Sequence, residues 1–201
     1  MGSMPRITCI LALAALASLA LPCGPNPRAD EGLPARHAVH GVSYIAQSNA
    51  NTCGAAVLAM ILSYVERKDV TEADVLKLHP EIAEKGTWIP LLWEIAEAGG
   101  FVVERGEGTT HILKRLLSED KPVVVYQWAT AEAKREHFRV VIGYDDSKRR
   151  FIVHDPGAPG GEGMAISYAA FAKMWEIAWH TDESGKAQKR FYLVICGRKV
   201  P

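Results

Sequence analysis

The apolar run over residues 53–65 constrains the fold more than any other feature of the sequence. Its Ala, Val, Leu, Met and Ile residues fall on every face of a helix, which is the pattern of a helix buried all round and not of a surface amphipath. Such a helix needs other layers around it. We therefore expect a central helix in one core, and 201 residues with 48% hydrophobic content suffice to build that core.

Three further helices are predicted from their start and stop signals. One has a Thr-x-x-Asp capping pattern, one has proline in its first turn and ends at Gly-Gly, and one starts at Thr110 as cap and ends before Lys-Pro. The first is expected over 71–78, the second from residue 88 to the glycines at 99–100, and the third over 110–120.

The second half of the chain changes to the pattern of a sheet. Short stretches rich in β-branched and aromatic residues, separated by turn residues, predict strands over 123–128, 138–144, 151–154 and 191–196. One more helix fits 168–175, and 181–189 is expected to be a polar loop. A helical half followed by an antiparallel sheet half indicates an α+β fold.

The N-terminus is typical of a targeting segment. Arg6 supplies a positive charge, residues 10–21 form a short apolar core, and Ser18-Leu19-Ala20 offers small residues for cleavage. This core is shorter than the roughly twenty residues of a membrane-spanning helix. We expect a signal peptide over 1–20 and export to the periplasm or the extracellular space. Residues 21–38 are expected to form a flexible tether, and the folded domain to span 39–201.

Cysteine usage leaves an odd thiol. Loss of Cys9 with the signal peptide leaves Cys23, Cys53 and Cys196 in a compartment that favours disulfides, so at least one stays unpaired. Cys23 resembles the lipid-acceptor cysteine of bacterial lipoproteins, although a proline precedes it. It is either a lipid anchor, or a free or disulfide-bonded cysteine. Cys53 is a reactive thiol, a disulfide partner of Cys196, or a small buried hydrophobe.

The position of Cys53 favours the interpretation that it is a reactive thiol. Asn51 or Thr52 can cap the central helix, which places Cys53 in its first turn, where unpaired N–H groups and the helix dipole favour a thiolate. Gly54 is expected to leave room for a substrate beside the sulfur. The backbone N–H of Cys53 can stabilise a developing oxyanion, and the side-chain amide of Gln47 is a candidate second donor.

A histidine and a carboxylate are predicted to meet on adjacent strands. If the hairpin loop is centred on Asp146, then His137 lies opposite Asp155, because cross-strand partners share a face. The carboxylate can then hold the imidazole in one tautomer while the other ring nitrogen takes the thiol proton. His154 competes for this role, but strand alternation sends it to the opposite face, and we interpret it as structural.

Other chemistries fit the sequence less well. With no net charge, the chain lacks the electrostatic signature of a nucleic-acid binder. No pair of possible ligands has the close spacing of a structural zinc site, and a helix N-terminus repels a cation. The glycine-rich segment 157–163 lacks the lysine of a phosphate loop and is interpreted as a mobile rim beside Asp155. No metal and no cofactor are therefore expected.

Together, Gln47, Cys53-Gly54 opening an apolar helix, His137 before a Val-Val-Ile-Gly-Tyr-Asp strand, and Asp155-Pro156 resemble papain-like cysteine peptidases. More closely, the set resembles the bacteriocin-processing peptidases that cut leader peptides after a double glycine, and their secreted single-domain relatives. The resemblance implies a papain-like fold, with a helical subdomain packed on an antiparallel sheet. It implies that Cys53 is the nucleophile, His137 the general base and acid, Asp155 its orienting partner, and Gln47 an oxyanion donor.

The expected activity is therefore cleavage of peptide bonds in a peptide or protein substrate through a thioester. Two alternatives stay open at this point. One is a peptide-binding module of the same fold without turnover, and the other is an acyl transferase that passes the thioester to an amine or thiol. The bacteriocin-processing enzymes usually carry this domain at the head of a membrane-spanning transporter, and an exported chain departs from that arrangement.

Overall fold

The computed structural model of the chain describes residues 32–181 and 183–199. The expected signal peptide, the lipid-anchor candidate Cys23 and most of the expected tether lie outside these residues. Within the two described ranges, no helix is both long and apolar enough to cross a membrane.

The helical part consists of four helices that follow one another in the chain. The capping box predicted for α2 is present, because the Thr71 side chain accepts from Asp74 N and the Asp74 carboxylate accepts from Thr71 N. A proline in the first turn of α4 and a glycine at its C-cap also match the predicted signals. The bounds are α1 Cys53–Glu66, α2 Glu72–Leu78, α3 Glu81–Lys85 and α4 Ile89–Ala98.

The other part is built on a seven-stranded sheet in which every described pairing is antiparallel. The strands follow the order β2-β9-β3-β4-β5-β6, and β1 pairs with the end of β4. Their bounds are β1 Arg36–Ala38, β2 Phe101–Glu107, β3 Val123–Trp128, β4 Glu136–Asp145, β5 Arg150–His154, β6 Met164–Ser167 and β9 Phe191–Arg198. Two more helices are α5 Thr110–Ser118 and α6 Tyr168–Met174.

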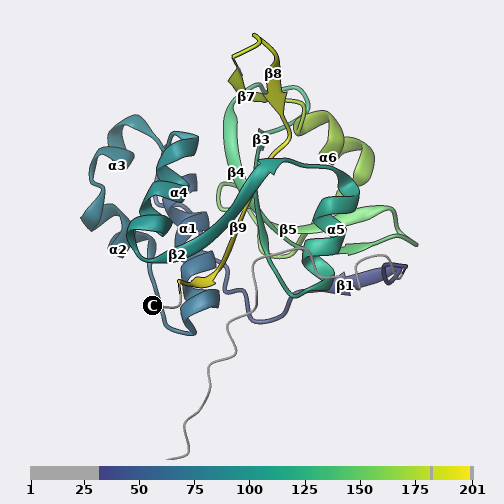
Figure 1. Cartoon of the computed structure of the whole chain (residues 1–201), viewed down its shortest axis with the longest axis horizontal. Coiled ribbons are helices and arrows are strands. Elements are labelled where there is room, and N and C mark those ends of the chain that lie inside the picture. The colour runs from purple at the N-terminus through teal and green to yellow at the C-terminus, as the bar shows by residue number, and fades with distance from the viewer. Residues whose placement is uncertain (1–31, 182, 200–201) are drawn as a thin grey trace, which may run out of the picture.

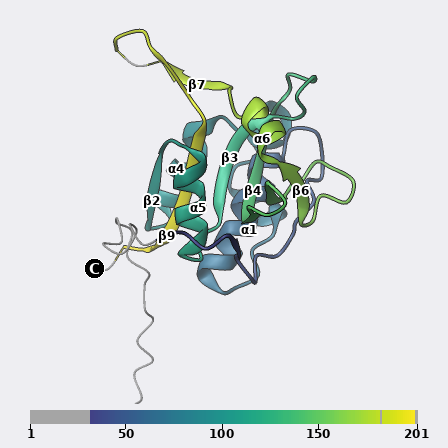
Figure 2. The same ribbon diagram turned by 90° about the vertical axis from the view of Figure 1, so that its right-hand side faces the viewer.

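Helices cover both faces of this sheet. The group α1 to α4 lies on one side of the strands in Figure 1, and α5 and α6 lie on the other. The view turned by 90° agrees, with α5 and α6 in front of the strands and α1 behind them (Figure 2). The α+β prediction, with a helical subdomain packed on an antiparallel sheet, is confirmed.

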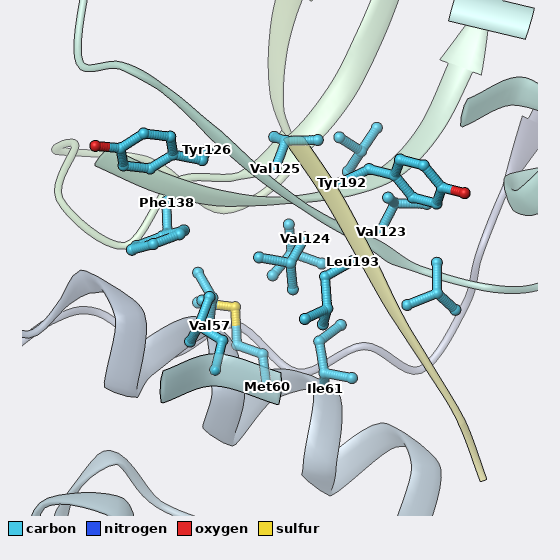
Figure 3. Close-up of a cluster of buried hydrophobic side chains, with 14 of the residues drawn as sticks. Val57, Met60, Ile61, Val123, Val124, Val125, Tyr126, Phe138, Tyr192 and Leu193 are labelled. Atoms are coloured by element: carbon cyan, nitrogen blue, oxygen red, sulfur yellow. The ribbon is translucent and has the colours of Figure 1, made fainter. Parts of the chain in front are cut away.

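The central helix packs its apolar side chains directly onto the sheet. Figure 3 shows Val57, Met60 and Ile61 of α1 pointing toward Val124 of β3 and Leu193 of β9. Every residue from the start of α1 to Ile61 is buried, as predicted from the apolar run. Full burial of a large aliphatic side chain stabilises the folded state by about 1.5–3 kcal/mol. These contacts therefore hold α1, including its first turn, in place against the sheet.

Two segments differ from the sequence prediction. The folded part begins before residue 39, because β1 lies within the expected tether and pairs with β4, while Tyr144 donates to Pro34 O. The expected polar loop near residue 185 is instead a two-stranded hairpin, with β7 Ala178–Thr181 and β8 Ala187–Lys189. Both strands are too short and too polar to produce a hydrophobic alternation in the sequence.

Candidate active site

The first turn of α1 carries no side-chain cap. Thr52 occupies the N-cap position, but its hydroxyl bonds to the backbone of Asn49 instead of to the helix. The first helical hydrogen bond runs from Ala56 N to Thr52 O, and the first turn contains no acidic residue. Thr52 is therefore the N-cap residue, as one of the two predicted alternatives, but α1 has no side-chain capping hydrogen bond. Its absence leaves the positive end of the helix available to an anion beside Cys53.

Neighbouring helices hold the loop that leads into α1. The carboxylate of Glu72, at the start of α2, accepts from Ser48 N at 3.0 and 3.1 Å. The side-chain amide of Asn51 donates to Ala83 O and Glu84 O in α3. These contacts fix the approach to Cys53 from outside the helix, so the helix start does not depend on a cap of its own.

Gly54 has a different role from the one expected. A Cβ on this residue would lie 2.4 Å from the Thr87 side chain, so the space beside Gly54 is filled by protein and is not open to a substrate. Within the described residues, the buried Oγ1 of Thr87 has no hydrogen-bond partner. Glycine at position 54 thus allows the segment before α4 to pack closely against the first turn of α1.

His137 and Asp155 are in direct contact. The Nε2 atom of His137 lies 2.6 Å from Oδ1 of Asp155, and both side chains are buried. Because Nε2 faces the carboxylate, Nδ1 is the ring nitrogen left for another partner.

The register that brings them together is not the predicted one. Asp145 pairs with Arg150 across a four-residue turn, and a bulge follows between Val141 and Gly143, so that Val140 pairs with His154. Continuing this register places Asp155 opposite Arg139, and His137 reaches the carboxylate as a diagonal neighbour on the same face. The expected register, with His137 directly opposite Asp155, is therefore wrong by two residues, although the expected contact is made.

The imidazole of His137 also has Cys53 as a neighbour. The thiol lies near enough to the imidazole to influence its pKa, which places thiol, imidazole and carboxylate in one cluster. Burial alone would lower the pKa of His137, but the interactions with Asp155 and Cys53 outweigh it and raise that pKa above its ordinary value. Cys53 is a free cysteine, whereas Cys196 is disulfide-bonded, so the Cys53–Cys196 disulfide does not form.

Further hydrogen bonds hold both the carboxylate and the backbone oxygen of Asp155. Its Oδ1 also accepts from Gly157 N at 2.9 Å, its Oδ2 accepts from Arg139 Nε at 2.7 Å, and Tyr44 donates to its backbone oxygen. Burial raises the pKa of this carboxyl, but the hydrogen bond and charge of His137 and the charge of Arg139 outweigh it and lower the pKa to about 2. The carboxylate is therefore ionised wherever the imidazole titrates.

The sequence reading missed Arg139 and its partner Gln127, both fully enclosed by protein. Nη1 of Arg139 donates to Gln127 Oε1 and Trp128 O, and Nη2 donates to Ala129 O. A signal was present, because an arginine in the middle of an apolar strand requires a buried anionic partner.

Gln47 lies at the edge of this cluster. Its backbone N–H donates to Pro156 O, and a Cβ on Gly157 would lie 2.7 Å from Gln47 Oε1 and 2.9 Å from His137 Cε1. The side-chain Nε2 donates to Asn49 O, and among the described residues the buried Oε1 has no partner. All four residues predicted for the site are thus brought together.

His154 belongs to a different cluster. Its Nε2 lies 3.0 Å from Val42 O, its Nδ1 accepts from Gly163 N, and its ring packs near Tyr44. Burial lowers the pKa of this imidazole, and its neutral form makes both contacts. In the described ranges, no three His, Cys, Asp or Glu side chains are grouped as a metal site.

Solved structures with a similar fold come from known peptidases. The peptidase domain of Streptococcus ComA, a bi-functional ABC transporter involved in quorum sensing, aligns with a TM-score of 0.59 at 18% identity, over 79% of this chain and all of that domain. A double glycine motif protease from an AMS/PCAT transporter, solved with its leader peptide, gives 0.54 at 19% identity over 79% and 96% of the two chains. Xylellain, a cysteine protease from Xylella fastidiosa, gives 0.55 at 12% identity over 98% and 96%.

These likenesses establish the papain-like fold. No curated protein sequence matches the chain. The sequence profile of the Peptidase_C39 like family, however, matches residues 39–183, which is most of the chain and contains the whole cluster around Cys53. The chain therefore belongs to the Peptidase_C39 like family and is a cysteine peptidase.

Proposed function

We propose that the protein hydrolyses peptide bonds through a thioester on Cys53. The observation that carries this proposal is the buried cluster in which the His137 imidazole contacts the Asp155 carboxylate and has the Cys53 thiol near enough to influence its pKa. The nucleophile, the base and the group that orients the base occur in the order that nucleophilic catalysis requires.

The steps follow from the two ring nitrogens. Nδ1 of His137 takes the thiol proton, and the sulfur attacks the substrate carbonyl carbon. The imidazolium then gives that proton to the leaving amine as the C–N bond breaks. In the second half, His137 takes a proton from water, the hydroxide attacks the thioester, and the products are a carboxylate and the regenerated thiol. Asp155 on Nε2 keeps the proton on that nitrogen throughout, so that Nδ1 faces the sulfur as an acceptor.

We assign oxyanion stabilisation to the uncapped helix start and to Gln47. The N–H of Cys53 lies in the first turn of α1, where helical partners are missing. The Nε2 of Gln47 carries two hydrogens, and its contact with Asn49 O uses one of them. Loss of one oxyanion donor typically lowers kcat about 10²–10³-fold, so the variant Gln47→Ala should fall in that range.

The proposed substrate is a peptide or an unfolded protein segment. Relatives of similar fold include a double glycine motif protease that was solved with a leader peptide, which supports a linear peptide as the substrate class. From residues 1–23 alone we further propose that the enzyme acts after export, with Cys23 as a candidate lipid anchor.

The test combines thiol reactivity with cleavage. Iodoacetamide should alkylate Cys53 well below about pH 8, and His137→Ala should slow the reaction at least about tenfold. The matched control is His180→Ala, because His180 is an exposed histidine of β7. A peptide library should be cut by wild type and left intact by Cys53→Ala. Alkylation unaffected by His137→Ala, together with an uncut library, would overturn the proposal in favour of a binding module.

A further inference from the structure

The buried guanidinium of Arg139 is an unusual feature of the site. Its residue is only 3% exposed, yet it lies on β4 two positions after His137, in a strand that is otherwise mostly apolar. A charge in such a place is costly unless it is paired and its donors are satisfied. Arg139 is paired with the Asp155 carboxylate, and its guanidinium makes four hydrogen bonds to protein acceptors from its five N–H donors.

The contacts of Arg139 come from two separate segments, and a third element is linked through Gln127. Nε binds Asp155 in the segment after β5, while Nη1 and Nη2 bind the backbone oxygens of Trp128 and Ala129 at the end of β3. Gln127, which accepts from Nη1, donates in turn to Phe171 O in α6. The planar fork of the guanidinium therefore fixes the direction from which it approaches the carboxylate.

This approach divides the two carboxylate oxygens between two partners. Arg139 takes Oδ2 at 2.7 Å, which leaves Oδ1 for His137 at 2.6 Å and for Gly157 N. Within the described part of the chain, three titratable side chains lie around the carboxylate. They are the His137 imidazole, the Cys53 thiol on the far side of that imidazole, and the Tyr44 phenol, which donates to the Asp155 backbone oxygen. Arg139 is the permanent positive charge in this set.

Resting on the peptidase function proposed above, we propose that Arg139 is the positioning residue of the site. It orients the Asp155 carboxylate so that Oδ1 faces His137 Nε2, and it keeps that carboxylate ionised under acidic conditions. Arg139 acts through Asp155 and touches neither the nucleophile nor the substrate. The oriented carboxylate thereby keeps the proton of neutral His137 on Nε2 and leaves Nδ1 for the thiol.

The experiment measures the pH dependence of two rates in wild type and variants. One is the alkylation of Cys53 by iodoacetamide, and the other is kcat/KM on a peptide cut by wild type. Arg139→Met removes a fixed positive charge beside the Asp155 carboxylate and its linked imidazole, which should raise the pKa of the imidazole. The acid limb of both profiles should therefore move to higher pH, by about one pH unit. Arg139→Lys keeps the charge and should keep the acid limb closer to that of wild type.

Controls separate positioning from folding. Arg115→Met removes a partly buried arginine that pairs with Glu104 and Glu119 away from the site, and it should leave both profiles in place. If Arg139→Met does not fold, as judged by circular dichroism, Arg139→Gln removes the same charge while keeping an amide donor.

Each outcome bears on a separate claim. Acid limbs that coincide with wild type in a folded neutral variant would overturn the positioning role and leave Arg139 as a purely structural ion pair. A wild-type alkylation profile that does not depend on His137 would instead overturn the proposed peptidase function itself.

Discussion

The change Asp155→Asn removes one buried charge while keeping the size of the side chain. In wild type, Oδ1 accepts from His137 and Gly157, and Oδ2 accepts from Arg139. An amide has one acceptor and one donor end, so either orientation sets its NH₂ group against a donor. Because hydrogen bonds from a charged donor are stronger, we expect the amide oxygen to face Arg139 and the NH₂ group to face His137 Nε2.

The stability part of this prediction follows from the carboxyl pKa. It lies at about 2 in the folded protein, against an ordinary value of 3.8. Since the folded-state pKa is the lower one, the contribution is fully present above about pH 4 and is lost as the pH falls through about 2. A difference of about 1.8 corresponds to about 2 kcal/mol. We expect Asp155→Asn to be less stable by at least that amount at pH 7, with a gap that closes at acidic pH.

The activity part follows from the imidazole tautomer. An NH₂ group on Nε2 selects the form protonated at Nδ1, which cannot take the thiol proton. A wrong tautomer of this kind lowers kcat by about 10⁴ in a serine-protease triad, and we expect a loss on the order of 10³–10⁴ here. In the double variant Asp155→Asn/Arg139→Met, the amide oxygen is free to face His137, so part of the activity should return.

The assays are urea unfolding followed by tryptophan fluorescence at pH 7, 5 and 3, and kcat/KM at neutral pH. A stability gap that does not narrow below pH 4 would refute the electrostatic account of Asp155. A loss of activity below about tenfold, or no recovery in the double variant, would refute the tautomer account.

Two glycine substitutions test the packing around the site. Gly157→Ala should displace Gln47 and His137, whose atoms lie 2.7 and 2.9 Å from the added Cβ, and so lower kcat/KM with little change in the thermal midpoint; unchanged kinetics would contradict this contact. Gly54→Ala should clash with Thr87 at 2.4 Å and cost about 1–3 kcal/mol in urea unfolding, and Gly54→Ala/Thr87→Gly should regain much of it. Equal stability of Gly54→Ala and wild type would show that the close approach is not required.

The central helix and its thiol could be predicted because the signals are local. A helix that is apolar on all faces is stable only when it is buried. The start of α1 at Cys53 coincides with the end of the polar turn in the sequence. The same holds for the capping box of α2 and for β3, whose bounds match the prediction. The site could therefore be predicted as a cluster, because the elements that carry its residues could be predicted. These residues are Gln47, Cys53, His137 and Asp155.

The hairpin register could not be predicted, because it depends on the conformation of the turn and on a β-bulge, and neither has a clear signal in the sequence. Arg149 adopts a positive φ of 48° in the turn, and the bulge after Val141 adds one residue to β4. The resulting partner of Asp155 lies two positions from the predicted one, so every side chain stays on its expected face and alternation within each strand does not reveal the difference. The predicted contact is made because Asp155 reaches both Arg139, which lies opposite it, and His137, two positions away on the same face of β4.

Contacts between distant segments were also out of reach. The Thr87 side chain beside Gly54 comes from the segment before α4, and the guanidinium beside Asp155 comes from the neighbouring strand β4, whose register was not predicted. For Gly54, the open space expected from its small size is occupied by another part of the protein. For Arg139, the buried charge could have been noticed, but its partner could be identified only from the fold.

The groups of the site are divided between two structural layers. Cys53 and Gln47 are attached to the helical side, whereas His137, Arg139 and Asp155 belong to adjoining strands and the segment that follows them. A small sliding of one layer over the other would lengthen the distance from sulfur to imidazole without disturbing the imidazole–carboxylate pair. Thiol reactivity therefore reports on interlayer alignment, and the imidazole tautomer reports on the sheet alone.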